Sequence, residues 1–456
     1  MLVSPLAAVL VGVALVLGLM LVGRVHAFLA LIVAALAVSC LSLGPAAGVA
    51  PVLESFGATA GKIGVVIALA AVIGKCLLAS GAAARIVGAN VRLLGERRAP
   101  QGLMGGGFVL AIPVFFDTVF YLLVPLARSL HRRTGAGYAL CLMALAGGAA
   151  AAHALVPPTP GPLLVADAFG VSIARALGFG LLVGIPACVV AYAVARRLDR
   201  LTPLTMRPLP GEDLGDETTA ETAVARPPSL ALALTPIALP IVLIGALEAT
   251  RALSTPGSES AFLSALGLLG NPSVALLLSA IVSLWMLARA RGLSLRALTG
   301  EVEESLLGAG VIILITAAGG AFGAALKATG IADVIAAGFD LAGAGRVTLL
   351  CGAFAVASLL KVAQGSSTVA MIVGSGMVAA VIDPAALTFD PVFLALAVGS
   401  GSLVGSWMND SGFWIFARMG VLTERETLRT WTPLFGAVGV AAFALTALLA
   451  LVWPAG

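Results

Sequence analysis

Long apolar segments separated by short polar or basic loops make up most of the chain. Segments long enough to cross a bilayer cover residues 4–23, 26–46, 62–86, 137–170, 172–195, 230–250, 262–288, 305–335, 391–416 and 432–453. A spanning helix needs about 20 mainly apolar residues, so each segment predicts a transmembrane helix. Two further apolar stretches, 103–127 and 347–382, are richer in Gly, Pro, Ser and Thr.

The first of these stretches is predicted to be a re-entrant hairpin. It is flanked by Arg92, Arg97 and Arg98 on one side and by Arg128, Arg132 and Arg133 on the other. Basic loops stay on the cytoplasmic side of a membrane, so both ends of the 103–127 stretch lie on one face. Pro113, in its middle, suits the turn at the tip. The 347–382 stretch is interpreted in the same way.

The remaining ten spans divide into five in each half of the chain. An odd number per half inverts the second half relative to the first. Residues 74–86 align with 323–335 at six identical positions, with Ser80 opposite Thr329, which supports an internal repeat. Both termini are then expected outside the cell.

We therefore predict an all-α polytopic membrane protein of two inverted-topology repeats, each with about five spanning helices, a re-entrant hairpin and a broken helix. The predicted domains are an N-terminal repeat at 1–198, a cytoplasmic linker at 199–229 and a C-terminal repeat at 230–456. The linker is rich in Pro, Thr and acidic residues and is expected to be a poorly ordered tether.

Two of the spanning segments carry breaks. The run from Pro157 to Pro162 interrupts the first, and Asn409-Asp410-Ser411-Gly412 interrupts the second. In lipid, the backbone groups that a break frees must be satisfied by polar partners. Breaks at matching places in two halves of a chain are typical of a solute site at the midplane of a transporter.

Composition agrees with a membrane class. The 456 residues are 60% hydrophobic and 11% charged, and the mean hydropathy is +1.10. The net charge of +4 comes from basic loops and does not indicate nucleic-acid binding. The five cysteines lie in apolar segments without metal-binding or disulfide spacing. The apolar run at 6–22 lacks a basic leader and is interpreted as the first span.

Five ionisable residues within apolar segments are candidates for function: Lys75, Asp117, His153, Lys361 and Asp410. Asp117 is interpreted either as a proton-binding group or as a cap of the hairpin. His153, four residues before the proline run, either carries protons or satisfies the carbonyls of the broken helix. Lys75 either contributes to binding or extends its amine toward the cytoplasmic surface.

The tip of the second hairpin is the predicted carboxylate site. It carries the polar residues Gln364, Ser366, Ser367 and Thr368. A half-helix that begins here would add free amides and its positive dipole end to these donors. An isolated serine would more simply bond back to a helical carbonyl. Asn409 and Asp410 supply acceptors for hydroxyl groups or for a coupling cation.

Enzyme functions are disfavoured. The chain has no G-x-S-x-G elbow and no H-E-x-x-H motif. Three histidines in total make an imidazole metal site improbable. No cofactor is expected.

At these motifs the chain resembles the gluconate:proton symporter (gluconate permease) family of the wider ion transporter superfamily. The matching stretches cover residues 74–86, 107–117, 153–162, 363–370 and 409–414, in family order. The chain departs from the family pattern at Leu78, Ala79 and Ala84, where acidic residues are usual, and at Trp407, often histidine. These departures bear on coupling and selectivity.

The resemblance implies proton-coupled uptake of gluconate, or of a related sugar acid or short hydroxy acid, across a bacterial inner membrane. It also implies a homodimer and an elevator-like motion. On this basis we expect Ser366, Ser367 and Thr368 at the carboxylate, and Thr159, Asn409 and Asp410 at the hydroxyls. The coupling proton is expected on Asp117, His153 or Asp410. A sodium-coupled carrier, an exporter of another carboxylate and an anion channel remain alternatives.

Overall fold

The computed structural model describes residues 4–208, 226–253, 261–331, 345–382, 387–408 and 410–453. Every regular element in these ranges is helical, which confirms the predicted all-α class. The elements are α1 (Pro5–Leu17), η1 (Gly18–Val22), α2 (Ala27–Leu43), α3 (Pro45–Ala79), α4 (Ala82–Leu94), η2 (Glu96–Arg98), α5 (Ala99–Ala111), α6 (Phe116–Thr134), α7 (Tyr138–Leu155), α8 (Pro160–Ala168), α9 (Ile173–Leu201), α10 (Leu230–Leu253), α11 (Ala261–Leu269), α12 (Pro272–Arg291), α13 (Leu295–Ala328), α15 (Arg346–Gln364), α16 (Ser367–Val381), α17 (Val392–Gly401), α18 (Ser411–Met419) and α19 (Glu424–Val452).

Eight segments in the described residues are long and apolar enough to cross a membrane. Seven of them coincide with predicted spans. The eighth, within α15, lies in the 347–382 stretch that the sequence assigned to a hairpin. At 19 residues, α15 is about 28 Å long, so this arm alone approaches the thickness of the hydrocarbon core.

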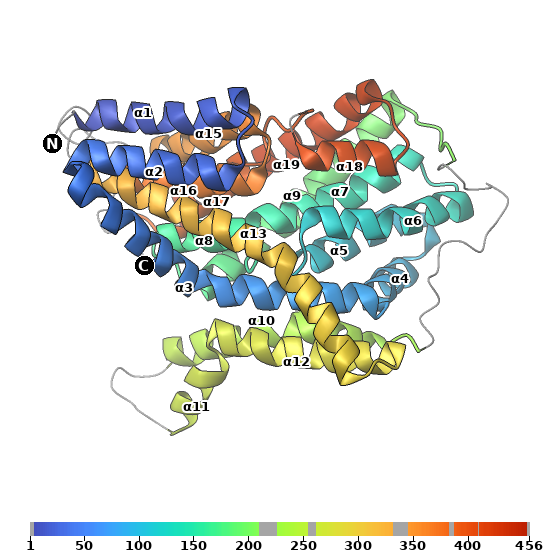
Figure 1. Ribbon diagram of the computed structural model, residues 1–456. Helices are drawn as coiled ribbons and strands as arrows, with labels where there is room; N and C mark the ends of the chain where they lie inside the picture. Colours follow the sequence, from blue (N-terminus) through green and yellow to red (C-terminus); the bar gives the residue numbers. More distant parts are fainter. Residues whose placement is uncertain are drawn as a thin grey trace.

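Both predicted hairpins are pairs of helices joined by a short turn. Residues 112–115 connect α5 to α6, and residues 365 and 366 connect α15 to α16. Gly365 has a φ of +89°, a value that an L side chain rarely adopts, which allows the second turn to be this tight. The α5–α6 pair occupies the right half of the molecule in Figure 1 and the α15–α16 pair the left half.

The broken helices are also present. α7 ends at Leu155 and α8 starts at Pro160, as the proline run predicts. The second break is longer than predicted, because α17 already ends at Gly401 and α18 starts at Ser411.

Two predicted spans are wrong as continuous helices. The segment at 62–86 is divided, because α3 starts earlier, at Pro45, and ends at Ala79, and α4 begins at Ala82 after Gly81 with a φ of +76°. The segment at 262–288 is divided into α11 and α12 around Gly270 and Asn271. The Asn271 side chain accepts a hydrogen bond from the Ser273 amide at 3.0 Å, and Pro272 takes the first helical position. These are ordinary signals for a helix start, and they outweigh the unbroken hydropathy of the segment.

The long helices α3 and α13 cross the whole molecule and pack along each other (Figure 1). α12 packs against α3, α10 packs against α12 and α4, and α2 lies against α13. On the other side, α16 packs against α13, so the second hairpin faces this group of helices. The hairpin turns and the helix breaks therefore lie inside the protein.

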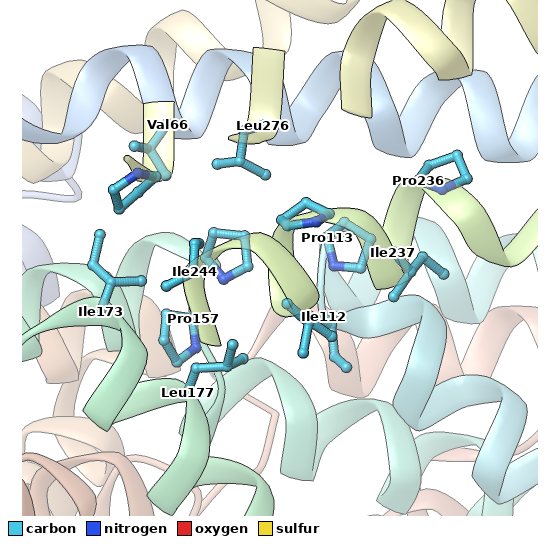
Figure 2. A pocket seen from close by; sticks show the side chains of 14 residues that line it. Val66, Ile112, Pro113, Pro157, Ile173, Leu177, Pro236, Ile237, Ile244 and Leu276 are labelled. Atoms are coloured by element: carbon cyan, nitrogen blue, oxygen red, sulfur yellow. The ribbon is translucent and has the colours of Figure 1, made fainter. Parts of the chain in front are cut away.

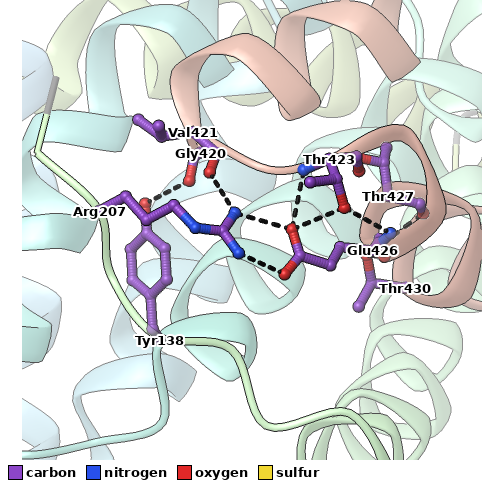
Figure 3. A network of polar contacts seen from close by, with 8 residues as sticks. All are labelled: Tyr138, Arg207, Gly420, Val421, Thr423, Glu426, Thr427 and Thr430. Atoms are coloured by element: carbon purple, nitrogen blue, oxygen red, sulfur yellow. Dashed lines mark hydrogen bonds and ion pairs between the residues drawn. The ribbon is translucent and has the colours of Figure 1, made fainter. Parts of the chain in front are cut away.

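The beginning of the predicted linker is held against the folded helices. α9 continues past the predicted boundary to Leu201. The Arg207 guanidinium then forms two hydrogen bonds with the Glu426 carboxylate, at 2.7 and 2.8 Å, and one with the Val421 carbonyl at 2.9 Å (Figure 3). The hydrogen-bonded Glu426 carboxylate is the largest cause of the raised pKa of Arg207. Residues 209–225 of the linker lie outside the described part.

Candidate functional site

A polar cavity lies where the two hairpin turns meet the second helix break. Its volume is about 190 Å³. Its lining consists of Phe115, Phe116, Asp117, Ala150, His153, Ile312, Ser366, Ser367, Thr368, Leu403, Asp410, Ser411, Gly412, Trp431 and Phe435. The cavity therefore collects residues from six helices, including one arm of each hairpin.

Three helix N-termini border this cavity. They are the N-termini of α6, α16 and α18, whose cap residues are Phe115, Ser366 and Asp410. The first amides of a helix have no intrahelical partner and carry the positive end of the helix dipole. Three such ends around one cavity favour an anionic ligand.

The hydroxyl cluster of the second hairpin lies at the predicted place. Ser366, Ser367 and Thr368 all line the cavity and are half-buried. The Ser366 hydroxyl accepts a hydrogen bond from the Val369 amide at 3.3 Å, so it caps α16. The Thr368 hydroxyl lies 3.3 Å from the Nε2 atom of His153.

Asp410 is held by a buried network. Its Oδ2 atom accepts hydrogen bonds from Lys361 Nζ and from the Ser406 hydroxyl, both at 2.5 Å. Its Oδ1 atom accepts from the Gly412 amide at 2.9 Å and caps α18. Lys361 is fully buried and also bonds to the Gly365 carbonyl in the hairpin turn. Asp410 and Lys361 thus connect the hairpin turn to the second break.

Asp117 and His153 are in a different position from Asp410. Asp117 is half-buried in the first turn of α6 and forms no ion pair with any residue that the structure describes. His153 uses Nε2 toward Thr368, whereas its buried Nδ1 has no hydrogen-bond partner in the described part of the chain. Both groups therefore retain an atom that can bind a proton without breaking an ion pair.

Of the other predicted residues, Thr159 is absent from the described cavity lining, and two lie wholly or partly outside the described part of the chain. The Thr159 hydroxyl is buried and donates to carbonyls of the first break, those of His153 and Val156, at 3.1 and 2.9 Å. Gln364 is the last residue of α15, but its side chain lies outside the described part. Asn409 also lies outside the described residues.

Lys75 has other partners and, within the residues that the structure describes, contacts none of these groups. It forms ion pairs with Glu304 at 2.7 Å and with Glu301 at 3.8 Å, which join α3 to α13. Trp407, where the family often has histidine, donates from its indole nitrogen to the Val362 carbonyl at 3.1 Å.

One wall of the cavity is aromatic, a feature that the sequence did not predict. Trp431 and Phe435 stack with ring centroids 3.8 Å apart, and Phe116 packs edge-on against both. The Trp431 indole donates to the Ser406 hydroxyl at 2.7 Å, which extends the Asp410 network. Trp431 lies at the start of a predicted span. The one sequence feature that could have indicated its role is the indole N–H group, which needs a hydrogen-bond partner when it is buried.

A second, apolar cavity lies on the other side of the hairpin turn (Figure 2). Its volume is only about 30 Å³, and it is lined by aliphatic and proline side chains from the first hairpin turn, the first break, α3, α9, α10 and α12. No charged or hydroxyl side chain lines it, so it offers no side-chain hydrogen bond to a polar anion. The polar cavity is the stronger candidate.

Comparisons with known proteins agree on one family. The model of the "GntP family permease" family matches residues 4–452. The chain is 34% identical to the gluconate permease of Pseudomonas aeruginosa, with 94% of each chain covered. It is 30% identical to the Gnt-II system L-idonate transporter of Escherichia coli, with 94% of this chain and 95% of the relative covered.

The fold is similar to that of a solved transporter, YdaH from Alcanivorax borkumensis. The TM-score is 0.65 at 15% identity, and the alignment covers 96% of this chain and 99% of the other. At this identity the likeness concerns the fold alone. Together with the apolar helices, these findings make the chain a multi-pass protein of the bacterial inner membrane.

Proposed function

The chain belongs to the GntP permease family, and on that premise we propose that it carries gluconate, or a related sugar acid or short hydroxy carboxylate, inward together with a proton. The names of the gluconate and L-idonate relatives support the substrate class. The observation that carries the proposal is the convergence of three helix N-termini on one polar cavity.

The carboxylate of the substrate binds at the N-terminus of α16. Ser366, Ser367 and Thr368 supply hydroxyl groups there, and the adjacent amides supply the dipole end of the helix. The hydroxyl groups of the substrate extend toward Ser411 and Asn409 at the second break. The aromatic wall covers the apolar face of the carbon chain.

The coupling proton binds Asp117, with His153 as the second candidate. The charge of Asp410 is balanced by Lys361 at 2.5 Å, whereas Asp117 has no such partner among the described residues. Two like charges about 8 Å apart repel each other by roughly 2 kcal/mol at an effective dielectric constant of about 20, so an ionised Asp117 opposes a carboxylate bound in the same cavity. Protonation of Asp117 removes this repulsion, so anion and proton bind together.

Asp410 then has a structural part in the site. Its three hydrogen bonds leave little capacity for substrate, so we assign it to holding the hairpin turn against α18. Thr159 similarly donates to carbonyls of the first break. One of these is the His153 carbonyl, so Thr159 helps to position His153.

We retain the inverted repeat at 1–198 and 230–456 as part of this proposal. In both halves a helical hairpin precedes a broken helix. The aligned residues Ser80 and Thr329 support it further, because each hydroxyl bonds to the carbonyl three residues before it. Each is followed by a glycine with positive φ, Gly81 at +76° and Gly330 at +71°. A homodimer also remains a proposal.

Uptake of labelled gluconate into proteoliposomes tests the function. An inward proton gradient should drive accumulation above the external concentration, and an equal sodium gradient should not. Accumulation driven only by sodium would show that sodium, and not the proton, is the coupling ion. Conductance that does not saturate with gluconate would indicate a channel, and no uptake of any sugar acid would remove the substrate class.

A further inference from the structure

A third cavity lies between two groups of helices, α3 and α13 on one side and α8 and α16 on the other. Its volume is about 160 Å³. It is lined by Thr59, Leu164, Asp167, Ala168, Gly319, Gly320, Gly323, Ala324, Lys327, Ile372, Ser375, Gly376, Ala379 and Ala380. Unlike the apolar cavity, it has charged and hydroxyl side chains in its wall.

This cavity lies on the outer side of the polar cavity. The basic C-terminal ends of α6, α9 and α12 gather at the right end of the molecule in Figure 1, and basic ends stay cytoplasmic. The helices α8, α13 and α16 run toward the opposite end, where both termini lie. The residues of the third cavity come from these outward-running parts.

The two cavities follow each other along the contact between α13 and α16. On α13, Ile312 lines the polar cavity and Gly319 lines the outer cavity, about 10 Å further along the helix. On α16, Thr368 lines the polar cavity, and Ile372 lines the outer cavity one turn later, about 6 Å away.

An apolar contact between α13 and α16 lies between the two sets of lining residues. Ile372 is buried, and its side chain lies on the face of Gly319. A Cβ atom built on Gly319 would collide with Cγ2 of Ile372 and would lie 3.3 Å from its Cβ. Because Gly319 has no side chain, the Ile372 side chain can pack directly against its backbone.

We propose that the outer cavity is the vestibule through which the anion reaches the polar cavity, and that Ile372 seated on Gly319 is the barrier between them. This inference rests on the proposed transport function. Lys327 and Asp167 lie in the vestibule wall, and Lys62 pairs with Asp167 at 3.1 Å, so two ammonium groups and one carboxylate lie in or next to this wall. An excess of positive charge there attracts a carboxylate.

Cysteine labelling tests the barrier without requiring substrate. The five native cysteines are first replaced, and single cysteines are introduced at Ala379 in the vestibule or at Ser367 in the polar cavity. A membrane-impermeant, anionic thiosulfonate is added outside right-side-out vesicles. We expect fast modification at position 379 and slow modification at position 367.

Ile372→Ala should then speed modification at position 367 by about tenfold or more, because the side chain that closes the passage is truncated. Val373→Ala is the matched control, since Val373 is similarly buried on α16 but belongs to the core formed with α2. It should leave the rate at position 367 unchanged. An unchanged rate at position 379 shows that the Ile372→Ala protein is folded.

Two results would overturn the inference. One is equal modification at both positions before Ile372 is changed, which means that no barrier exists. The other is a rate at position 367 that Ile372→Ala leaves unaltered. Failed gluconate uptake with the expected labelling pattern would instead refute the substrate and leave the barrier in place.

Discussion

Replacing one member of the buried pair between Lys361 and Asp410 should destabilise the protein more than replacing both. We consider Lys361→Met, Asp410→Asn and the double variant. Lys361 is fully buried and Asp410 is 8% exposed, so each single change leaves one charge without its partner inside the protein. Loss of one partner of a buried pair costs about 3–5 kcal/mol.

The double variant should recover most of that loss. Neutral replacement of both members of a buried pair is often neutral or stabilising. The Asp410→Asn change also keeps the cap of α18, because the new amide oxygen can accept from the Gly412 amide as Oδ1 does now. At about 1.4 kcal/mol per factor of ten, each single change lowers the ratio of folded to unfolded protein by at least about a hundredfold.

Unfolding in mixed micelles with increasing SDS, followed by tryptophan emission, measures these differences. Trp431 is one of the five tryptophans that contribute to this emission, and its indole donates to the Ser406 hydroxyl that contacts Asp410. The reasoning fails if the double variant is as unstable as the worse single variant. It also fails if both single variants unfold like the unmodified protein.

Three further outcomes are expected. Ser366→Ala should weaken gluconate binding in a thermal-shift titration by about tenfold while protein yield is maintained, since it removes a donor and a cap worth roughly 1 kcal/mol. Unchanged affinity with lower yield would favour a purely structural cap. Gly148→Ala should reduce the yield of monodisperse protein because its Cβ meets the Met104 backbone carbonyl, whereas Gly88→Ala, with open space around it, should not. Arg207→Ala should cost less than about 1 kcal/mol in the same SDS assay, because its ion pair is partly exposed (Figure 3); a larger loss would contradict this.

The sequence was informative wherever a local rule decides the structure. The proline run at 157–162 ends a helix because proline lacks an amide hydrogen, so the first break could be placed closely. Hydroxyl residues around Gly365 predicted the second hairpin turn in the same way. The division of 262–288 was also readable, from Asn271 followed by proline, but the hydropathy of the segment obscured it.

Contacts between distant segments could not be read from the sequence. Lys361 and Asp410 are 49 residues apart, and nothing in either motif indicates that they meet. Thr159 is expected from the family resemblance to contact the hydroxyl groups of the substrate, but its own hydroxyl donates to carbonyls of the broken helix. The part of Trp431 in the cavity wall depends on how α19 packs, which periodicity alone does not determine.

The central claim is tested most directly by two assays of the Asp117→Asn variant. One measures accumulation of gluconate driven by a proton gradient, and the other measures exchange of labelled for unlabelled gluconate. If Asp117 carries the coupling proton, proteoliposomes with this variant should still exchange labelled for unlabelled gluconate, but an inward proton gradient should no longer drive accumulation. Glu54→Gln, which neutralises an exposed carboxylate on α3, should accumulate gluconate like the unmodified protein. Accumulation by Asp117→Asn that still follows the proton gradient would contradict the account.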